Sequence, residues 1–149
     1  MNLSFKQMLD MPPNWLLGCL ILAWAQVQVL PGLPPLEVSG WSFVVVGVVF
    51  MVLAFRAFRQ ARTTVVPHKT PAQLITHGVF AHSRNPIYFA DMMLLAGLSL
   101  IWGSWLGLIL LPALGWVLTK RFIEPEEARL KATFSANYED WASRTRRWL

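Results

Sequence analysis

Four apolar segments dominate this sequence and limit the folds that are open to it. We expect membrane-spanning helices over residues 14–30, 38–58, 86–102 and 104–123. Each approaches the length of about 20 residues that a helix needs to cross the hydrocarbon core of a bilayer. Because 55% of the 149 residues are hydrophobic and only 14% are charged, the chain has too little polar surface for a water-soluble globule. We therefore expect an all-α, polytopic membrane protein with a single domain over residues 1–149.

Prolines and glycines separate these segments. Residues 31–35 read Pro-Gly-Leu-Pro-Pro, and proline cannot continue a helix. Between the third and fourth segments there is only Gly103-Ser104. A link this short predicts an antiparallel helical hairpin.

The basic residues predict how the chain is oriented. All 13 Lys and Arg residues fall before the first segment, at the end of the second or between the second and third, or at and after the end of the fourth. By the positive-inside rule, that side is cytoplasmic and holds both termini. Bases that flank apolar runs in this way indicate membrane orientation rather than nucleic-acid binding. The compact chain suggests a bacterial inner membrane.

Two parts of the sequence should lie in the cytoplasm, the loop 60–85 and the tail 124–149. The tail carries large side chains at helical spacing, which predicts one amphipathic helix. We expect this helix to lie along the membrane surface or to cap the bundle. The residues in its stripe are Glu127, Leu130, Phe134, Tyr138, Trp141, Thr145 and Trp148.

The first candidate site is the segment 78–88, which reads Gly-Val-Phe-Ala-His-Ser-Arg-Asn-Pro-Ile-Tyr. Pro86 suits the first turn of the third helix, and Ser83 or Asn85 is placed to cap it. The free N–H groups and the dipole at a helix N-terminus favour an anion. Arg84 adds a positive charge at the same place.

Tyr88 and Asp91 are three residues apart and therefore share one face of the third helix. Asp91 would lie about one turn into the membrane. A carboxylate there is costly unless it is paired or faces a water-filled cavity, which makes it a functional candidate. The ordinary alternative is an interfacial Asp91 that pairs with Arg84 or accepts hydrogen bonds from nearby backbone N–H groups.

The second candidate site is a pair of glutamates at the start of the tail. Pro125 is expected to end the fourth helix and to open the tail helix. Glu127 is in phase with Leu130 and Phe134, whereas Glu126 is rotated by about 100°. A glutamate on a buried stripe requires a cation. In the ordinary reading, both acids simply offset the dipole of the helix.

Histidines and absent motifs narrow the chemistry further. His68, His77 and His82 share the loop with Arg84, where they are able to bind an anion or move a proton. Their spacing does not predict a metal site, and Cys19 is the only cysteine. No two glycines lie two residues apart, which excludes a G-x-G nucleotide loop. Any cofactor site must therefore be built from helix ends and loops.

The second half of the chain resembles a known family. The segment 78–88 is similar to the signature G-P-[YF]-x-x-x-R-[HN]-P-x-Y of isoprenylcysteine carboxyl methyltransferases and the related phospholipid methyltransferases. The tail from Glu126 is similar to the family's E-E-x-x-L-x-x-x-F-G-x-x-Y-x-x-Y end. The chain departs from the family pattern at Val79, Ser135 and Trp141, which replace Pro, Gly and the second Tyr.

The resemblance implies an integral-membrane methyltransferase that uses S-adenosylmethionine on a lipophilic acceptor. The acceptor would be a prenylcysteine-like carboxylate, a lipid amine or a small thiol. Asn85 stands where the eukaryotic prenylcysteine enzymes have His, which argues against a prenylcysteine. The implied cofactor-binding residues are His77, Gly78, His82, Arg84, Asn85, Pro86, Tyr88, Glu126 and Glu127. The candidates for the catalytic step are Arg84, Tyr88 and Asp91.

The sequence also leaves two alternatives to an enzyme open. A small four-helix multidrug exporter needs a membrane-embedded acid in its first helix, and residues 14–30 contain none. A non-catalytic membrane protein that retained the fold is the other alternative, although Arg84, Tyr88 and both glutamates are present. The expected partners are membrane lipids, a lipophilic substrate and a second copy of the chain.

Overall fold

The computed structural model describes residues 10–63 and 73–149. Over these ranges the chain is helical apart from turns and one isolated bridge between Ser83 and Arg146, as expected for the all-α class. Its elements, in chain order, are α2 (Pro12–Val29), α3 (Glu37–Gln60), the 3-10 turn η1 (Gly78–Ala81), α4 (Pro86–Trp102), α5 (Trp105–Leu118), the π-helical turn η2 (Thr119–Ile123) and α6 (Glu124–Arg144).

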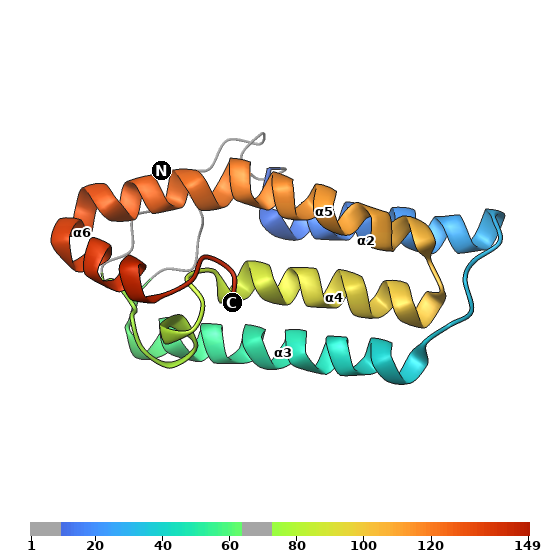
Figure 1. Ribbon diagram of the computed structural model, residues 1–149, viewed down its shortest axis with the longest axis horizontal. Coiled ribbons are helices and arrows are strands. Elements are labelled where there is room, and N and C mark those ends of the chain that lie inside the picture. The colour runs from blue at the N-terminus through green and yellow to red at the C-terminus, as the bar shows by residue number, and fades with distance from the viewer. Residues whose placement is uncertain (1–9, 64–72) are drawn as a thin grey trace.

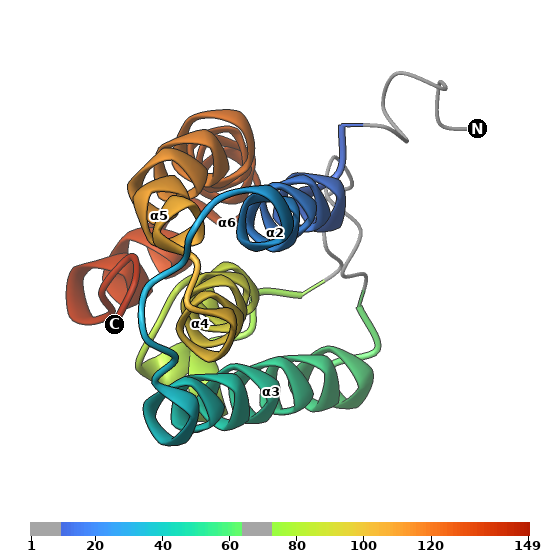
Figure 2. The ribbon, with the colours of Figure 1, turned by 90° about the vertical axis from the view of Figure 1, so that its right-hand side faces the viewer.

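Helix α4 lies at the centre of the bundle. Helices α2 and α5 pack on one side of it, and α3 packs along the other (Figure 1). Viewed along the bundle, α4 lies between α2 and α3 and separates these two helices (Figure 2). The starts of α2 and α4, the end of α3 and all of α6 lie at the same end of the molecule (Figure 1). We call this the basic end, because the tail and the described residues of the predicted cytoplasmic loop are located there.

Proline and glycine set the helix boundaries, as the sequence predicts. Pro12 and Pro86 lie in the first turns of α2 and α4, where the backbone N–H groups have no partner within the helix, so the missing N–H of proline costs nothing. Helix α4 ends at Gly103, which adopts the left-handed conformation at φ 67°. Ser104 then caps α5, since its Oγ accepts a hydrogen bond from the Gly107 amide at 3.1 Å. The expected helical hairpin is therefore present, with its bounds within one residue of the prediction at this turn.

Small residues let α3 approach α4 closely. A Cβ atom built on Gly40 would lie 2.7 Å from the carbonyl oxygen of Gly97, and one built on Gly97 would lie 2.7 Å from that of Gly40. Farther along the same face, a Cβ on Gly47 would lie 3.0 Å from the Ala90 carbonyl oxygen. Contacts between small residues of this kind are typical of helices packed in membranes, where close van der Waals packing holds helices together.

Two helices of the described chain are long and apolar enough to cross a bilayer. They are Glu37–Gln60 and the continuous helix Trp105–Arg144, and Pro86–Trp102 is a shorter apolar helix. The outer surface of α3 exposes Val45, Val48, Val49 and Val52. Exposed aliphatic faces of this extent are costly in water and suit contact with lipid.

The prediction that Pro125 ends the fourth helix is wrong. Helices α5 and α6 join through η2, so the helical path that begins at Trp105 continues through Pro125 without a break and is first interrupted at Ser135. A proline in a helix removes one hydrogen bond and clashes with the carbonyl four residues earlier. The π turn accommodates this, because the Glu124 amide bonds the Thr119 carbonyl five residues back.

The tail is not a single straight helix either. It kinks at Ser135, whose φ of 43° and ψ of −117° are not helical. The family signature that the tail resembles has glycine at this position, and glycine adopts such angles without steric cost. The kink turns the later half of α6 back toward the bundle. Leu130 and Phe134 before it, and Tyr138 and Trp141 after it, pack into the same cluster.

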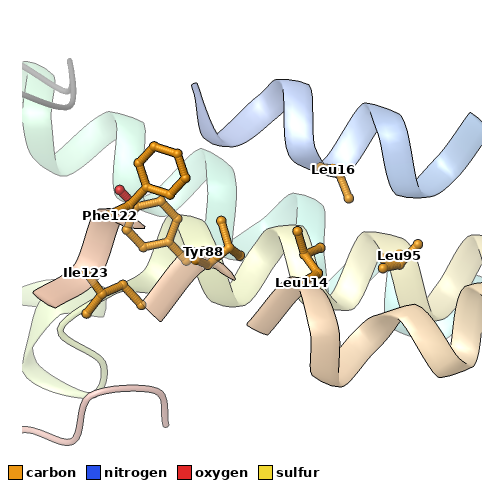
Figure 3. Close-up of a cluster of buried hydrophobic side chains, with 7 residues drawn as sticks. Leu16, Tyr88, Leu95, Leu114, Phe122 and Ile123 are labelled. Atoms are coloured by element: carbon orange, nitrogen blue, oxygen red, sulfur yellow. The ribbon is translucent and has the colours of Figure 1, made fainter. Parts of the chain in front are cut away.

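The core divides into two clusters of buried side chains. The first joins α2, α4, α5 and η2, and its members are Leu16, Tyr88, Leu95, Leu114, Leu118, Phe122 and Ile123 (Figure 3). The second joins the end of α3 and η1 to the kinked tail, and its buried members are Ala54, Ala57, Ile75, Val79, Phe80, Tyr138 and Trp141. Together the clusters hold the start of α4 and the start of α6 side by side.

Candidate functional site

A cavity of about 520 Å³ lies at the basic end, where α2, α3, η1, α4 and α6 come together. Its walls are mostly apolar and include the first turn of α2 and the later half of α3. The polar residues that line it are Arg84, Asn85, Tyr88, Asp91 and Glu126. A largely apolar cavity with a few convergent polar groups is the usual form of a small-molecule site.

Tyr88 and Glu126 meet in this cavity, although 38 residues separate them. The Tyr88 hydroxyl donates a hydrogen bond to Glu126 Oε2 at 3.2 Å. Tyr88 lies in the first turn of α4, and its ring packs against Phe122 of η2 (Figure 3). The hairpin, followed by the π turn, thus brings a carboxylate from α6 against the phenol of α4.

Glu127 is rotated by about 100° from Glu126 around α6 and is held by two arginines. Arg147 donates to both of its carboxylate oxygens, from Nε at 3.1 Å and from Nη2 at 2.7 Å. Arg84 Nη2 lies 3.5 Å from Glu127 Oε1. The hydrogen bonds with Glu127 raise the pKa of Arg147 above its ordinary value, so this guanidinium stays charged. Two positive charges therefore share one carboxylate.

Arg84 is only partly satisfied by these contacts. Its Nη1 donates to the Tyr138 hydroxyl at a long 3.4 Å, and its buried Nε has no hydrogen-bond partner. Buried guanidinium nitrogens ordinarily have acceptors, so an unpaired one marks a place where an anion fits. Arg84 also lies just before the N-terminus of α4, whose dipole favours negative charge.

The end of the chain lies across the start of α4. The Arg84 amide donates to the Arg146 carbonyl at 2.9 Å, beside the bridge between Ser83 and Arg146. Asn85 begins α4, yet its side chain does not cap the helix. Instead, Asn85 Nδ2 donates to the Arg147 carbonyl at 3.0 Å. The Ser83 hydroxyl accepts a hydrogen bond from the Asn85 amide at 3.1 Å, which is a local contact ahead of the helix. Neither side chain therefore caps α4, contrary to the prediction.

Asp91 lies one turn beyond Tyr88 on α4. The whole residue is 4% exposed, and it lines the same cavity. The alternative pairing with Arg84 is not the contact that the structure has, because Arg84 pairs with Glu127. Asp91 therefore faces the cavity with the apolar side chains of α2 and α3 across from it.

The predicted loop residues are placed differently. His77 and Gly78 lie at the start of η1 and His82 follows its end; all three are exposed and do not line the cavity. Gly78 has a φ of 62°, so it makes the turn into η1. His68 lies outside the described residues. The structure thus brings together Arg84, Asn85, Pro86, Tyr88, Asp91 and Glu126 around the cavity, with Glu127 behind Arg84.

Several residues at this site had no signal in the sequence. The α3 side chains Met51, Phe55 and Phe58 line the cavity, although they belong to an ordinary apolar run. Met11 contributes from just before α2. The role of Arg147 in holding Glu127 depends on a fold-back over 20 residues, and no local pattern indicates such a contact. The Phe80 carbonyl, which accepts from Trp141 Nε1 at 2.9 Å, is equally invisible in the sequence.

Comparison with known protein families gives a match over most of the described chain. The family model described as phospholipid methyltransferase matches residues 36–137, more than half of the chain. The matched range contains α3, the hairpin and the start of α6, and therefore Arg84, Tyr88, Asp91 and both glutamates. No curated protein and no solved structure matched the chain.

Proposed function

The chain belongs to the phospholipid methyltransferase family, and from this premise we propose that it is a membrane methyltransferase that transfers a methyl group from S-adenosylmethionine to a lipophilic acceptor. The observation that carries the proposal is the cavity at the basic end. There the polar groups of Arg84, Tyr88 and Glu126 meet an apolar wall formed by α2 and α3.

The residues present fit the cofactor. S-adenosylmethionine, when bound, supplies a methyl group on a positively charged sulfur, and it also carries an ammonium and a carboxylate. Glu126 or Glu127 supplies the negative charge for the ammonium. Arg84, with its unpaired buried Nε, binds the carboxylate of the cofactor or of the acceptor. Asn85 and Pro86 form the start of α4 beside it. His77, Gly78 and His82 do not line the cavity itself, and the role proposed for their exposed loop is to cover the bound cofactor from outside.

The chain's own groups would then orient the acceptor and handle its proton. An apolar cavity excludes water and holds the reacting groups close together, which lowers the entropic part of the barrier. Tyr88 packs and hydrogen-bonds at the site. Asp91 takes the proton if the acceptor is a lipid amine or a small thiol. A prenylcysteine-like carboxylate needs no base, and Arg84 would orient it instead.

We also propose that the chain spans the membrane four times, with both termini in the cytoplasm of a bacterial cell. Helices α2, α3, α4 and α5 are the spans, and the basic end faces the cytoplasm. Cysteines introduced as Pro35→Cys in the α2–α3 linker and as Ser143→Cys in the tail, each in a Cys19→Ala background, test this. We expect an impermeant maleimide to label Pro35→Cys from the periplasmic side and Ser143→Cys only in inverted vesicles. Labelling of both from one side would contradict four spans.

Binding of S-adenosylmethionine to the full chain tests the function. We expect calorimetry on protein purified in detergent with added lipid to show saturable binding at one site. Transfer of a radiolabelled methyl group to a lipid amine, a prenylcysteine analogue or a small thiol then identifies the acceptor. Protein that is folded by circular dichroism and binds no S-adenosylmethionine would favour the non-catalytic alternative over an enzyme.

A further inference from the structure

The contacts of Glu127 are unequal, although two arginines surround it. Arg147 approaches both carboxylate oxygens within ordinary hydrogen-bond distance, at 3.1 and 2.7 Å. Arg84 Nη2 stays 3.5 Å from the nearer oxygen, beyond the usual range for an N–H donor. Arg147 thus forms a bidentate ion pair with Glu127, whereas Arg84 lies beside this pair without a close hydrogen bond to the carboxylate.

This inequality leaves Arg84 with unused binding capacity. Its side chain is only 18% exposed, its contact with the Tyr138 hydroxyl is long, and its buried Nε has no acceptor. The two guanidinium groups carry one more positive charge than Glu127 neutralises. A poorly hydrated guanidinium in this state favours an anion that accepts from two of its nitrogens.

We propose that Arg147 is a positioning residue: by engaging both oxygens of Glu127, it keeps Arg84 free to bind the carboxylate of S-adenosylmethionine. This inference rests on the proposed function and deepens it, because it assigns Arg84 to the cofactor rather than to the acceptor. Without Arg147, Glu127 is free to close the 3.5 Å gap to Arg84 and to occupy the edge of the guanidinium that the cofactor carboxylate needs.

The backbone of the chain end explains how Arg147 is held in place. The Arg147 carbonyl accepts from Asn85 Nδ2 at 3.0 Å, and the Arg146 carbonyl accepts from the Arg84 amide at 2.9 Å. Trp148 packs against the first core cluster. Anchors on both sides of Arg147 therefore fix its position relative to Arg84, and its side chain has only to reach Glu127.

The test compares two ligands that differ in one group. Decarboxylated S-adenosylmethionine keeps the sulfonium and the amine and lacks the carboxylate. We expect the full chain to bind S-adenosylmethionine about ten- to hundred-fold more tightly than the decarboxylated compound, the range typical of a hydrogen-bonded charged pair. The Arg147→Gln variant should lose this preference, with the two dissociation constants becoming similar. Arg147→Lys should retain part of it, because an ammonium still holds Glu127.

Arg144→Gln is the matched control. It removes the same charge from an exposed residue of the same chain end, whose guanidinium pairs with Asp140 on the surface. It should keep the wild-type preference. An undiminished preference in Arg147→Gln, or an equal loss in Arg144→Gln, would overturn the role of Arg147. If Arg147→Gln does not fold, a full wild-type preference in Arg147→Lys together with an unchanged affinity for both compounds overturns it instead.

The same measurement separates this inference from the function on which it rests. Wild-type protein that binds both compounds with equal affinity overturns the assignment of Arg84 to the cofactor carboxylate but supports the methyltransferase. Wild-type protein that binds neither compound overturns both.

Discussion

Replacing Glu126 with glutamine is expected to weaken the binding of S-adenosylmethionine about ten- to hundred-fold, which is the usual loss when a charged hydrogen-bond partner becomes neutral. Glu126 lines the cavity and accepts the Tyr88 hydrogen bond at 3.2 Å, whereas both oxygens of Glu127 are engaged by Arg147. Glu126 is therefore the acid that we expect to meet the ammonium of the cofactor. Calorimetric titration of the variant in detergent with added lipid measures the effect.

The controls use the neighbouring glutamates. Glu124→Gln removes an exposed carboxylate that pairs with Lys120 on the surface, and it should leave the dissociation constant unchanged. Glu127→Gln separates the two readings of the glutamate pair. If this variant loses affinity for S-adenosylmethionine and Glu126→Gln does not, Glu127 is the acid that binds the ammonium and Glu126 is not.

Replacing Gly103 with alanine is expected to lower the free energy of unfolding by about 2–5 kcal/mol. Gly103 has a φ of 67°, which an L-residue with a side chain adopts at a cost. A Cβ atom there would also lie 2.1 Å from the Leu33 carbonyl oxygen, so the linker between α2 and α3 would have to move. This turn sets the register of the hairpin that brings Tyr88 to Glu126. Unfolding in a denaturing detergent, followed by circular dichroism, measures the loss.

Gly78→Ala separates the two causes. Gly78 has a similar φ of 62°, but a Cβ atom there would have no neighbour within 4 Å. The Gly78→Ala variant should therefore lose only the part of the free energy of unfolding that comes from the backbone conformation, about 1–2 kcal/mol. Equal losses in the two variants would mean that the close approach of Leu33 to Gly103 adds nothing to stability.

Much of the fold follows from local chemistry. The sequence predicts a helix over about residues 86–102, and α4 spans Pro86–Trp102, because Pro86 opens it and Gly103 follows its last residue. The hairpin followed from the two-residue link, and the membrane class followed from the apolar runs. The stripe of the tail was also predicted in part: Leu130, Phe134, Tyr138 and Trp141 do pack together on the bundle.

The local sequence does not predict that the helix continues from α5 into α6. Proline usually ends a helix, yet at Pro125 a π turn absorbs it, and the bundle on either side stabilises that turn by burying Phe122 and Ile123. Ser135 gives no indication of a kink in the sequence, since serine is not a residue that favours positive φ. The kink became interpretable from the family pattern, which has glycine at that position.

The candidate site shows the same division. Arg84, Tyr88, Asp91 and the two glutamates were recognisable from their residue types and their places at helix ends, because costly groups in an apolar chain need partners. The sequence does not show which of these residues contact one another. Glu126 contacts Tyr88 because of the rotation of α6 after the π turn. Glu127 contacts Arg147 because the chain end folds back over 20 residues. Periodicity reports the direction of a side chain around its own helix, whereas the identity of its neighbour depends on how separate helices pack.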